Sequence, residues 1–385
     1  MTFLPAPLRR WALRAHRDLE IRDHVLQYLF LEITRRCDLS CLHCGSDCSR
    51  AAASPELDAD SWLSIVDHMQ ARYAPFFVIT GGEPLVSPDL FRITGHLGRT
   101  GARWGMVTNG MALDRAAFER LSSCGMSSMT VSLDGLEESH NALRGSPRAF
   151  ERAASAIGIL GESGLAFRDA VTCARPGTLA ELDAIGELLA GSGMNSWRIF
   201  RIFPRGRAAG RPELGLGGAE TAALLEWIAR MRPVYARRGL RLSYGCEGYV
   251  GLDLDRRIRD EPFFCKSGIN IASILADGRI SGCSNNPPGL AQGRLGRDEF
   301  ADVWEGRFAE FRDRSWMRSG ACADCAEWRD CLGSSIHLRE PGRPGPAFCY
   351  RKDLERGGMA RCPAMPGKRD ANALWRSPRR GRRRR

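Results

Sequence analysis

A regular alternation of two kinds of segment between residues 28 and 202 constrains the fold of this 385-residue chain more than any other feature. Short apolar segments rich in β-forming residues predict strands at 28–34, 76–80, 102–108, 129–134, 166–172 and 196–202. Amphipathic segments between them predict helices at 58–72, 88–99, 114–123, 146–161 and 179–189. Such alternation is typical of parallel sheets. We therefore predict an α/β fold, either a partial barrel or a doubly wound sheet.

Polar or glycine-rich motifs follow the first four predicted strands. They are Cys37, the GGEP motif at 81–84, the NG pair at 109–110 and the DG pair at 134–135. In both architectures the chemistry gathers at the carboxyl ends of the strands. Four motifs at the same end of the sheet predict one shared pocket.

The chain contains fourteen cysteines. It has no apolar stretch near the ~18 residues of a membrane span and no apolar core of a secretory signal at its start, so we expect a cytoplasmic protein. Cysteines in that reducing compartment indicate metal binding rather than disulfides. One group is Cys37, Cys41, Cys44 and Cys48, and a second is Cys322, Cys325, Cys331 and Cys349, with Cys265 and Cys283 between them.

Most of the net charge of +11 lies at the end of the chain, where residues 368–385 carry nine basic residues and one acidic residue. Blocks of like charge are usually solvated and disordered, which is our prediction for residues 366–385. A nucleic-acid contact is the alternative, and we expect nucleic acid not to be a partner.

The spacing Cys37-x3-Cys41-x2-Cys44 supplies three thiolates from one loop. A [4Fe–4S] cluster normally takes four thiolates. Three leave one iron with an open position, as in catalytic metal sites. A structural zinc site with Cys48 as the fourth ligand is the alternative, and the spacing alone does not decide between them.

Residues 28–203 resemble the radical S-adenosylmethionine (SAM) superfamily. The resemblance rests on FLEITRRCDLSCLHC (30–44), TGGEP (80–84), TNG (108–110) and VSLDG (131–135), with His140 and Arg144 downstream. It implies a partial (β/α)6 barrel and a [4Fe–4S] cluster whose open iron binds the amino and carboxylate groups of SAM. It also implies reductive cleavage of SAM to a radical that removes a hydrogen atom from a substrate, with an electron donor such as flavodoxin or ferredoxin.

The same resemblance implies a set of SAM-contacting residues at the strand ends, namely His43, Gly81, Gly82, Glu83, Pro84, Asn109, Ser132, Asp134 and Arg144. His43 stands where the family usually has an aromatic residue. Glycines without Cβ permit close approach of the backbone to a ligand. We expect Glu83 to accept from the SAM ammonium group, and Ser132, Asp134 and Asn109 to lie near the ribose. Arg144 offers a fork for a carboxylate, with an ordinary surface ion pair as the alternative.

The spacing Cys265-x12-Gly278-x4-Cys283, followed by Cys322-x2-Cys325-x5-Cys331 and Cys349, resembles the SPASM extension of this superfamily. It implies that Cys322, Cys325, Cys331 and Cys349 hold an auxiliary cluster, with a zinc ribbon as the alternative. A second auxiliary cluster has Cys265 and Cys283, but Ser335 stands where the pattern has cysteine. Cys246 or Cys362 is then needed to complete it, unless it is absent. We expect Cys48 to be a bystander thiol and Cys124 and Cys173 to be small core residues.

We therefore predict a barrel at 28–245 after an extension at 1–27, a SPASM-like domain at 246–365 and the basic tail at 366–385. The predicted activity is a SAM-dependent radical modification of a peptide or small protein, with Cys246 as a candidate hydrogen-atom donor. The nearest subgroup is one associated with precursor peptides bearing a Tyr-x10-Gly-Asp-Leu pattern. The alternatives are a tetrapyrrole or cofactor precursor as substrate, a nucleic-acid-modifying enzyme, and a non-catalytic zinc-binding interaction protein.

Overall fold

The computed structural model describes residues 5–50, 55–245, 247–340 and 342–357. The predictions made for Cys246, Cys362 and the basic tail lie outside these residues and stay predictions.

The core of the fold is a curved sheet of ten strands in the order β10-β9-β8-β1-β2-β3-β4-β5-β6-β7. The six strands that come first in the chain lie side by side in chain order and run parallel. They are β1 (Tyr28–Glu32), β2 (Phe76–Thr80), β3 (Trp104–Thr108), β4 (Met126–Ser132), β5 (Phe167–Ala174) and β6 (Ser196–Arg201). All six overlap the predicted strands. This parallel arrangement confirms the partial barrel.

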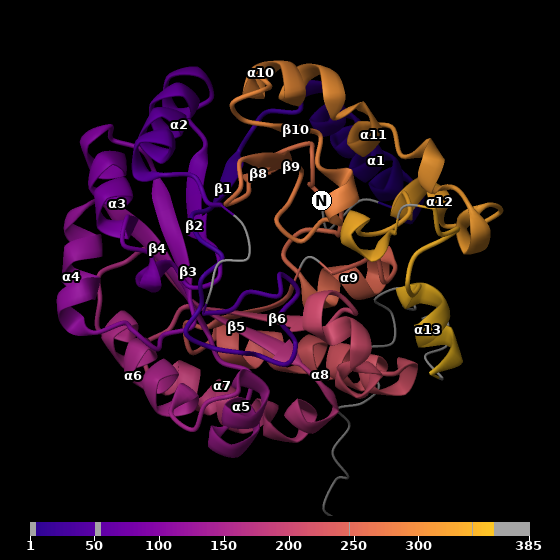
Figure 1. The fold of residues 1–385 in the computed structure, drawn as a ribbon. Helices are drawn as coiled ribbons and strands as arrows, with labels where there is room; N and C mark the ends of the chain where they lie inside the picture. Colours follow the sequence, from indigo (N-terminus) through magenta and orange to yellow (C-terminus); the bar gives the residue numbers. More distant parts are fainter. Residues whose placement is uncertain (1–4, 51–54, 246, 341, 358–385) are drawn as a thin grey trace, which may run out of the picture.

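Helices cover the outer face of the curved sheet, as Figure 1 shows. They are α2 (Ala59–Arg72), α3 (Leu90–Arg99), α4 (Arg115–Ser123), α5 (Glu137–Arg144), α6 (Ala149–Gly161), α7 (Leu182–Gly191) and α8 (Gly218–Ala236). In α3 the buried residues Leu90, Ile93, Thr94 and Leu97 recur at helical spacing and face the sheet. Asp58 and Asp114 cap α2 and α4 by accepting from backbone N–H groups three residues on. The apolar stripe and the caps explain why these helices begin close to the predicted residues.

The sheet is wider than the six predicted strands. β7 (Arg241–Tyr244) pairs with β6, and β8 (Ile271–Ile274) pairs in parallel with β1 at the opposite edge of the barrel. β9 (Arg279–Ser281) and β10 (Gly293–Arg294) continue that edge antiparallel. The segment after residue 246, in which the sequence showed little periodicity, therefore joins the barrel sheet directly. This pairing places the loop that contains Cys283 beside the start of the barrel.

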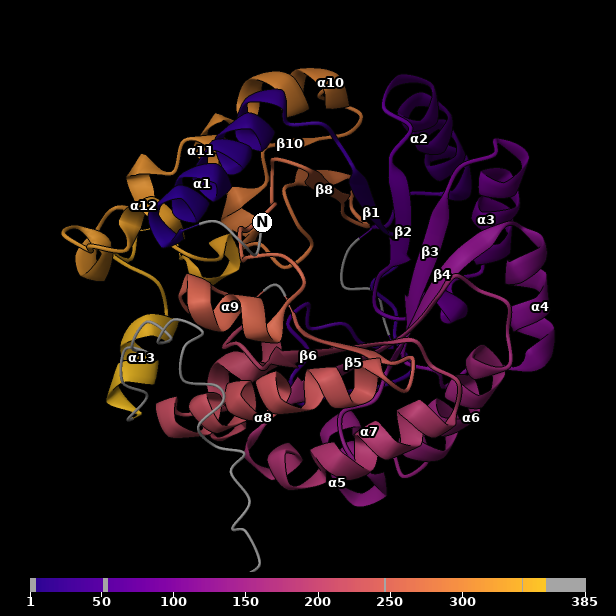
Figure 2. The ribbon, with the colours of Figure 1, turned by 180° about the vertical axis from the view of Figure 1, so that it is seen from behind.

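The rest of the chain closes the open side of the barrel with short helices, seen from behind in Figure 2. They are α9 (Leu252–Ile258), α10 (Phe300–Asp302), α11 (Ala309–Arg312), α12 (Trp328–Cys331) and α13 (Tyr350–Arg356). An unpredicted helix, α1 (Ala6–Asp23), packs against this part, where Arg14 Nε donates to Asp330 at 2.7 Å. Among the described residues, no helix combines the length and apolar character that crossing a membrane requires.

Candidate functional site

The loop of residues 35–49, which we call the cluster loop, leaves β1 at its carboxyl end and carries the first group of cysteines. Cys37 and Cys41 are buried and Cys44 is half-buried. The base of the loop is closed by a hydrogen bond from Cys37 N to Ser49 O at 2.8 Å. The fold thus brings the three predicted cluster ligands to the end of the sheet where the other motifs lie.

The spacing of the sulfur atoms bears on the choice between an iron–sulfur cluster and zinc. Within the described part of the chain, the one group of three or more potential ligand atoms within 4.8 Å of one another is His43, Asp134 and Cys173. A zinc tetrahedron with Zn–S bonds of about 2.3 Å holds its sulfurs about 3.8 Å apart. Neither cysteine group reaches that spacing. In this arrangement the sulfur positions match a larger cluster better than a single zinc ion.

Two arginines hold the cluster loop, and the sequence pointed to neither. Arg207 Nε donates to the carbonyl of Cys41 at 2.7 Å, and its Nη1 donates to the carbonyl of Cys48 at 2.8 Å. Arg35 Nη2 donates to the carbonyl of Ser46 at 2.7 Å. These contacts satisfy loop carbonyls and place positive charge beside the thiols, which suits a site that gathers negative sulfurs.

Two predicted SAM-site residues lie beside the thiols themselves. Asn109 Nδ2 lies 3.8 Å from Cys37 Sγ and donates to Asp38 Oδ1 at 2.7 Å. Arg144 Nη1 lies 3.7 Å from Cys41 Sγ. Both side chains therefore offer N–H donors to the sulfur atoms of predicted cluster ligands.

Glu83 is fully buried, and other parts of the chain already occupy its carboxyl group. Oε1 accepts from Leu85 N at 3.1 Å and from Thr108 Oγ1 at 2.8 Å, and Oε2 accepts from Asn109 N at 2.7 Å. Burial raises the pKa of Glu83 to about 7, although these hydrogen bonds act against that rise. Glu83 thus joins the ends of β2 and β3. Its predicted contact with the SAM ammonium group stays a prediction.

The two glycines of the GGEP motif lie against the backbone of the neighbouring loop, and their predicted contact with SAM stays a prediction. A Cβ on Gly81 would lie 2.4 Å from Thr34 O, and one on Gly82 would lie 2.2 Å from Arg36 O. Gly82 N also donates to Thr34 O at 2.8 Å. Gly81 has a φ of 154°, which L side chains rarely adopt. The motif therefore lets the end of β2 pack directly under the cluster loop.

Asp134 is the centre of a buried network. Its Oδ2 accepts from Arg144 Nε at 2.7 Å and lies 3.5 Å from His43 Nε2, and its Oδ1 accepts from Cys173 N at 2.8 Å. His140 Nδ1 accepts from Asp134 N at 2.9 Å. Burial acts to raise the pKa of Asp134, but the neighbouring cation Arg144 and the two histidines lower it to about 2. Arg144 is thus a buried partner of Asp134, and the surface ion pair considered for it is wrong.

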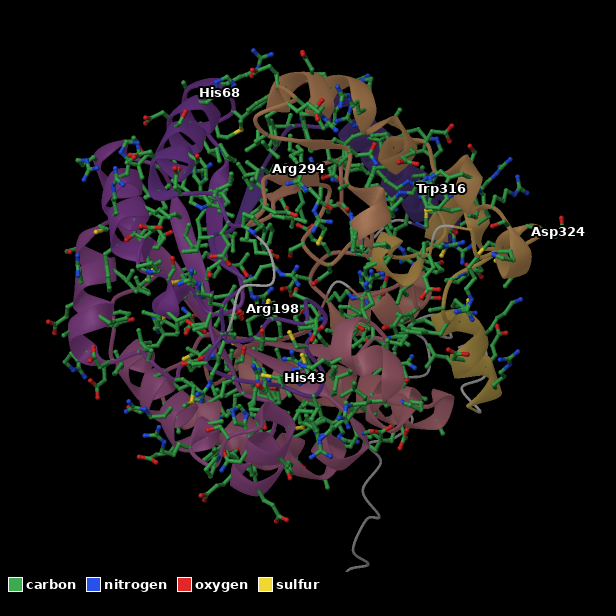
Figure 3. All side chains as sticks on the ribbon, in the orientation of Figure 1. His43, His68, Arg198, Arg294, Trp316 and Asp324 are labelled. Atoms are coloured by element: carbon green, nitrogen blue, oxygen red, sulfur yellow. The ribbon has the colours of Figure 1, made fainter. Side chains whose placement is uncertain are left out.

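Burial lowers the pKa of both histidines of this network to about 4, so each is neutral at pH 7. Figure 3 places His43 inside the ring of helices, with sulfur atoms nearby. Cys173 lies within 4.8 Å of His43 and Asp134, so it borders this network as well as the core. Since Arg144 already neutralises Asp134, the group has little attraction for a metal cation.

The remaining residues of the predicted set lie around the same strand ends. Pro84 is buried at the first position of a short 3-10 helix, and Ser132 is half-buried as the last residue of β4. A hydrogen bond from Cys48 lowers the pKa of Cys44 to about 5. Burial raises the pKa of Cys37 to about 12. Cys48 is therefore a direct neighbour of Cys44, one of the three predicted ligands.

The second group of cysteines surrounds a separate cavity of about 390 Å³. Its lining includes Cys322, Cys325, Cys331 and Cys349. Burial, together with the charge of the three other thiols, raises the pKa of Cys331 to about 12. The buried Arg339 directs Nη2 to Cys322 Sγ at 3.2 Å. A cluster with four thiolates fits this cavity, and Arg339 supplies a compensating cation.

The residues of the second predicted auxiliary cluster are engaged differently. Arg314 Nη2 donates to the carbonyl of Cys265 at 2.6 Å, and Ser281 Oγ donates to that of Cys283 at 3.0 Å. Ser335 is fully buried, and its Oγ donates to the carbonyl of Glu247 at 2.7 Å. The hydroxyl that replaces the expected thiol is thus used within the protein.

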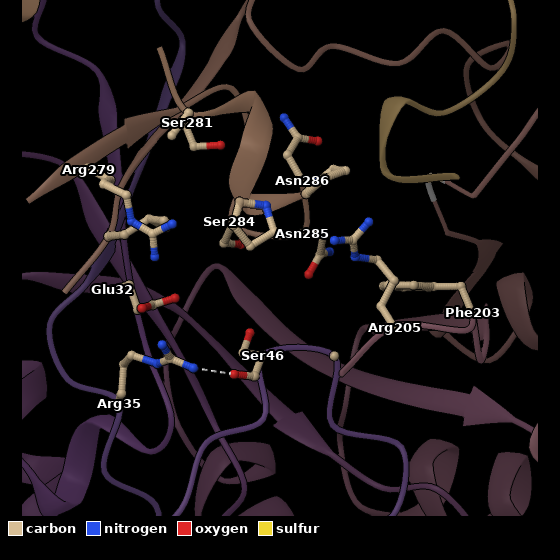
Figure 4. A pocket seen from close by; sticks show the side chains of 15 residues that line it. Glu32, Arg35, Ser46, Phe203, Arg205, Arg279, Ser281, Ser284, Asn285 and Asn286 are labelled. Atoms are coloured by element: carbon tan, nitrogen blue, oxygen red, sulfur yellow. Dashed lines mark hydrogen bonds between the residues drawn. The ribbon is translucent and has the colours of Figure 1, made fainter. Parts of the chain in front are cut away.

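A second cavity, of about 100 Å³, lies between the cluster loop and the stretch that follows Cys283, and we call it the central cavity (Figure 4). One wall is the cluster loop at Gly45 and Ser46, and another is the stretch 284–288, just after Cys283. Charged and polar side chains line it, including Glu32, Arg35, Arg205, Arg279, Asn285 and Asn286. Burial raises the pKa of Glu32 to about 7. The sequence did not point to this cavity, because its lining comes from segments far apart in the chain.

Comparison with known proteins agrees with this geometry. Residues 31–188 match the Radical SAM superfamily, and residues 265–326 match SPASM, an iron–sulfur cluster-binding domain. The Fe-coproporphyrin III synthase of Methanosarcina barkeri is 30% identical over 359 residues, which are 85% of this chain and 89% of that protein. The chain belongs to the radical SAM superfamily. As a radical SAM enzyme with a SPASM domain, it uses SAM, a [4Fe–4S] cluster and auxiliary iron–sulfur clusters.

Two further proteins are similar to this radical SAM enzyme. The AdoMet-dependent heme synthase of Methanosarcina barkeri is 26% identical over 325 residues, which cover 78% of this chain and 89% of that protein. The crystal structure of Streptococcus suis SuiB bound to S-adenosylmethionine has a TM-score of 0.64 and 15% identity, covering 82% of this chain and 75% of SuiB. The second similarity shows a shared fold.

Proposed function

We propose that this enzyme removes a hydrogen atom from one side chain of a peptide held in the central cavity. The observation that carries the proposal is the position of that cavity between the cluster loop and the stretch after Cys283. A substrate placed there touches the loop that holds the SAM cluster on one side. On the other side it touches the stretch that follows Cys283, a predicted ligand of the second auxiliary cluster.

The size and lining of the central cavity support a peptide side chain. Pockets for whole small molecules usually measure about 300–1,000 Å³ and are mostly apolar. The central cavity measures about 100 Å³ and has charged walls. One amino-acid side chain fills such a space, while the rest of a peptide stays outside it.

Different residues near this cavity bind the cluster and orient its ligands. Cys37, Cys41 and Cys44 hold the [4Fe–4S] cluster, which when reduced supplies the electron that cleaves SAM. Asn109 and Arg144 orient two of these cysteines through their N–H groups. Under this proposal the enzyme works in the cytoplasm, where thiols stay reduced.

The test uses anaerobically reconstituted full-length enzyme with SAM, dithionite and peptides whose side chains are deuterated. We expect deuterium in 5′-deoxyadenosine and a matching mass change in the peptide, both by mass spectrometry. The matched control is Cys41→Ser, which removes one predicted cluster ligand and should stop both signals. SAM cleavage without deuterium transfer from any peptide tested would reject the peptide as substrate.

A tetrapyrrole is the second candidate substrate, because two relatives at 26–30% identity carry heme synthase and coproporphyrin synthase names. The same assay with iron coproporphyrin in place of the peptide separates the candidates. Tetrapyrrole conversion together with unchanged peptides would favour this second candidate.

A further inference from the structure

Arg205 stands out on the wall of the central cavity. It follows β6 in the loop that also carries Phe203, and it is half-buried. In Figure 4 its guanidinium points toward the side chain of Asn285. Within the described chain, the guanidinium makes one hydrogen bond, from Nη1 to His337 O at 3.3 Å. Across the described residues, no carboxylate oxygen lies within 4.0 Å of this guanidinium.

The other two arginines of the central cavity are already engaged. Arg35 donates to the carbonyl of Ser46, and Arg279 Nε pairs with Asp277 at 2.8 Å. Arg205 differs from both. The carboxylate whose charge acts to raise the pKa of Arg205 is Glu340, and Glu340 itself pairs with Arg343 at 3.7 Å. Burial lowers the pKa of Arg205, which reflects the cost of holding this cation away from water without a close anion.

The chain holds Arg205 in this position by specific contacts. Phe203 packs against His337 with ring centroids 4.6 Å apart, and Arg205 N donates to Phe203 O at 2.8 Å. His337 thus contacts both residues of the loop, through its ring and through its carbonyl. A half-buried cation fixed in this way is arranged to receive an anion.

We propose that Arg205 binds a carboxylate of the substrate, so that the enzyme acts on a peptide at an acidic residue. This inference rests on the proposed function and specifies its substrate class. The planar guanidinium can make two parallel hydrogen bonds to a carboxylate, and the Asn285 amide can add a third donor.

The experiment compares two blocked pentapeptides, Ac-Ala-Ala-Glu-Ala-Ala-NH2 and its Gln counterpart, as ligands of the anaerobic holoenzyme by calorimetry. We expect the Glu peptide to bind at least about tenfold more tightly, as for loss of a charged hydrogen-bond partner. Arg205→Gln should abolish this preference, and Arg205→Lys should keep only part of it. The matched control is Arg238→Gln, because Arg238 pairs with Glu187 on the outer surface, and it should leave the preference unchanged.

Three results would overturn the inference: equal affinities for the two peptides, a preference that survives Arg205→Gln, or no binding of either peptide at about 1 mM, where a charge-assisted contact is still measurable. Iron content of each variant checks that the fold is intact. Modification of peptides without regard to acidic residues would reject the inference and leave the proposed function standing. If Arg205-dependent binding is seen for iron coproporphyrin but for neither peptide, the peptide proposal fails.

Discussion

Replacement of Asp134 by asparagine tests the buried network beside the cluster loop. The Asp134→Asn side chain still accepts from Cys173 N, but it leaves Arg144 without its counter-charge. Both partners are nearly inaccessible, with side chains 0% and 10% exposed. Removing one member of a buried ion pair costs about 3–5 kcal/mol, and the retained hydrogen bond places this variant near about 3 kcal/mol.

The chain offers a matched control in Asp255. Its side chain is also 0% exposed, and it accepts from Arg259 Nη1 at 2.7 Å and from Phe263 N at 2.9 Å. Asp255→Asn therefore also breaks a buried Asp–Arg ion pair while keeping the hydrogen bond from a backbone N–H group. We expect a similar loss of stability from it, because burial and partners are alike.

The two variants should differ at the cluster. Arg144 lies 3.7 Å from Cys41 Sγ, so only Asp134→Asn disturbs a ligand of the first cluster. Urea unfolding should show both midpoints lowered by about 1 M, for a slope near 3 kcal/mol per M. SAM cleavage per iron should fall in Asp134→Asn alone. A stability loss below about 1 kcal/mol for Asp134→Asn, or an equal loss of SAM cleavage in both variants, would refute this reasoning.

Three other substitutions test separate parts of the structure. Arg339→Gln removes a cation 3.2 Å from Cys322 Sγ, so the auxiliary cluster should become harder to reduce, by roughly 50–150 mV for a charge interaction of a few kcal/mol; an unchanged potential in an EPR redox titration would contradict this. Glu32 keeps its proton up to about pH 7 in the folded chain but only to about 4.5 when unfolded, so it contributes stability that is full below pH 4.5 and is lost as the pH rises through 7. Urea unfolding at pH 5 and pH 8 should show that the free energy of unfolding changes by about 2.5 kcal/mol less between these pH values in Glu32→Gln than in the unmodified protein, and an equal change in both proteins would reject it. Arg207→Ala removes two hydrogen bonds to cluster-loop carbonyls and should loosen that loop by about 2 kcal/mol; full iron content in the variant would show that the loop does not need them.

The sequence predicted the parts of this enzyme that short segments encode. β2 was predicted at the residues where it is found, because FFVIT is a compact apolar segment of strand formers. The spacing of Cys37, Cys41 and Cys44 indicated them as cluster ligands, and the structure places all three in one loop at the strand ends. β8 was missed because four residues, IASI, carry too little pattern, and its pairing with β1 is set by residues about 240 positions away.

The contacts that complete the site have no local sequence signal. Arg207 and Arg205 lie in a loop without periodicity, and their partners are 130–166 residues away in the chain. The glycines of the GGEP motif also make room for the backbone of Thr34 and Arg36, a role that the sequence did not indicate. Such roles depend on which strands become neighbours, which a single chain does not reveal before it folds.

The central claim is that Cys37, Cys41 and Cys44 hold a cluster with one iron open to SAM. Electron–nuclear double resonance of the reduced enzyme with SAM labelled by ¹⁵N at the amino group and ¹⁷O at the carboxylate measures this directly. We expect hyperfine coupling to both labels, retained in Cys48→Ala and absent in Cys41→Ser. Coupling to neither label in enzyme with a full complement of iron, or stoichiometric zinc in place of iron, would contradict the claim.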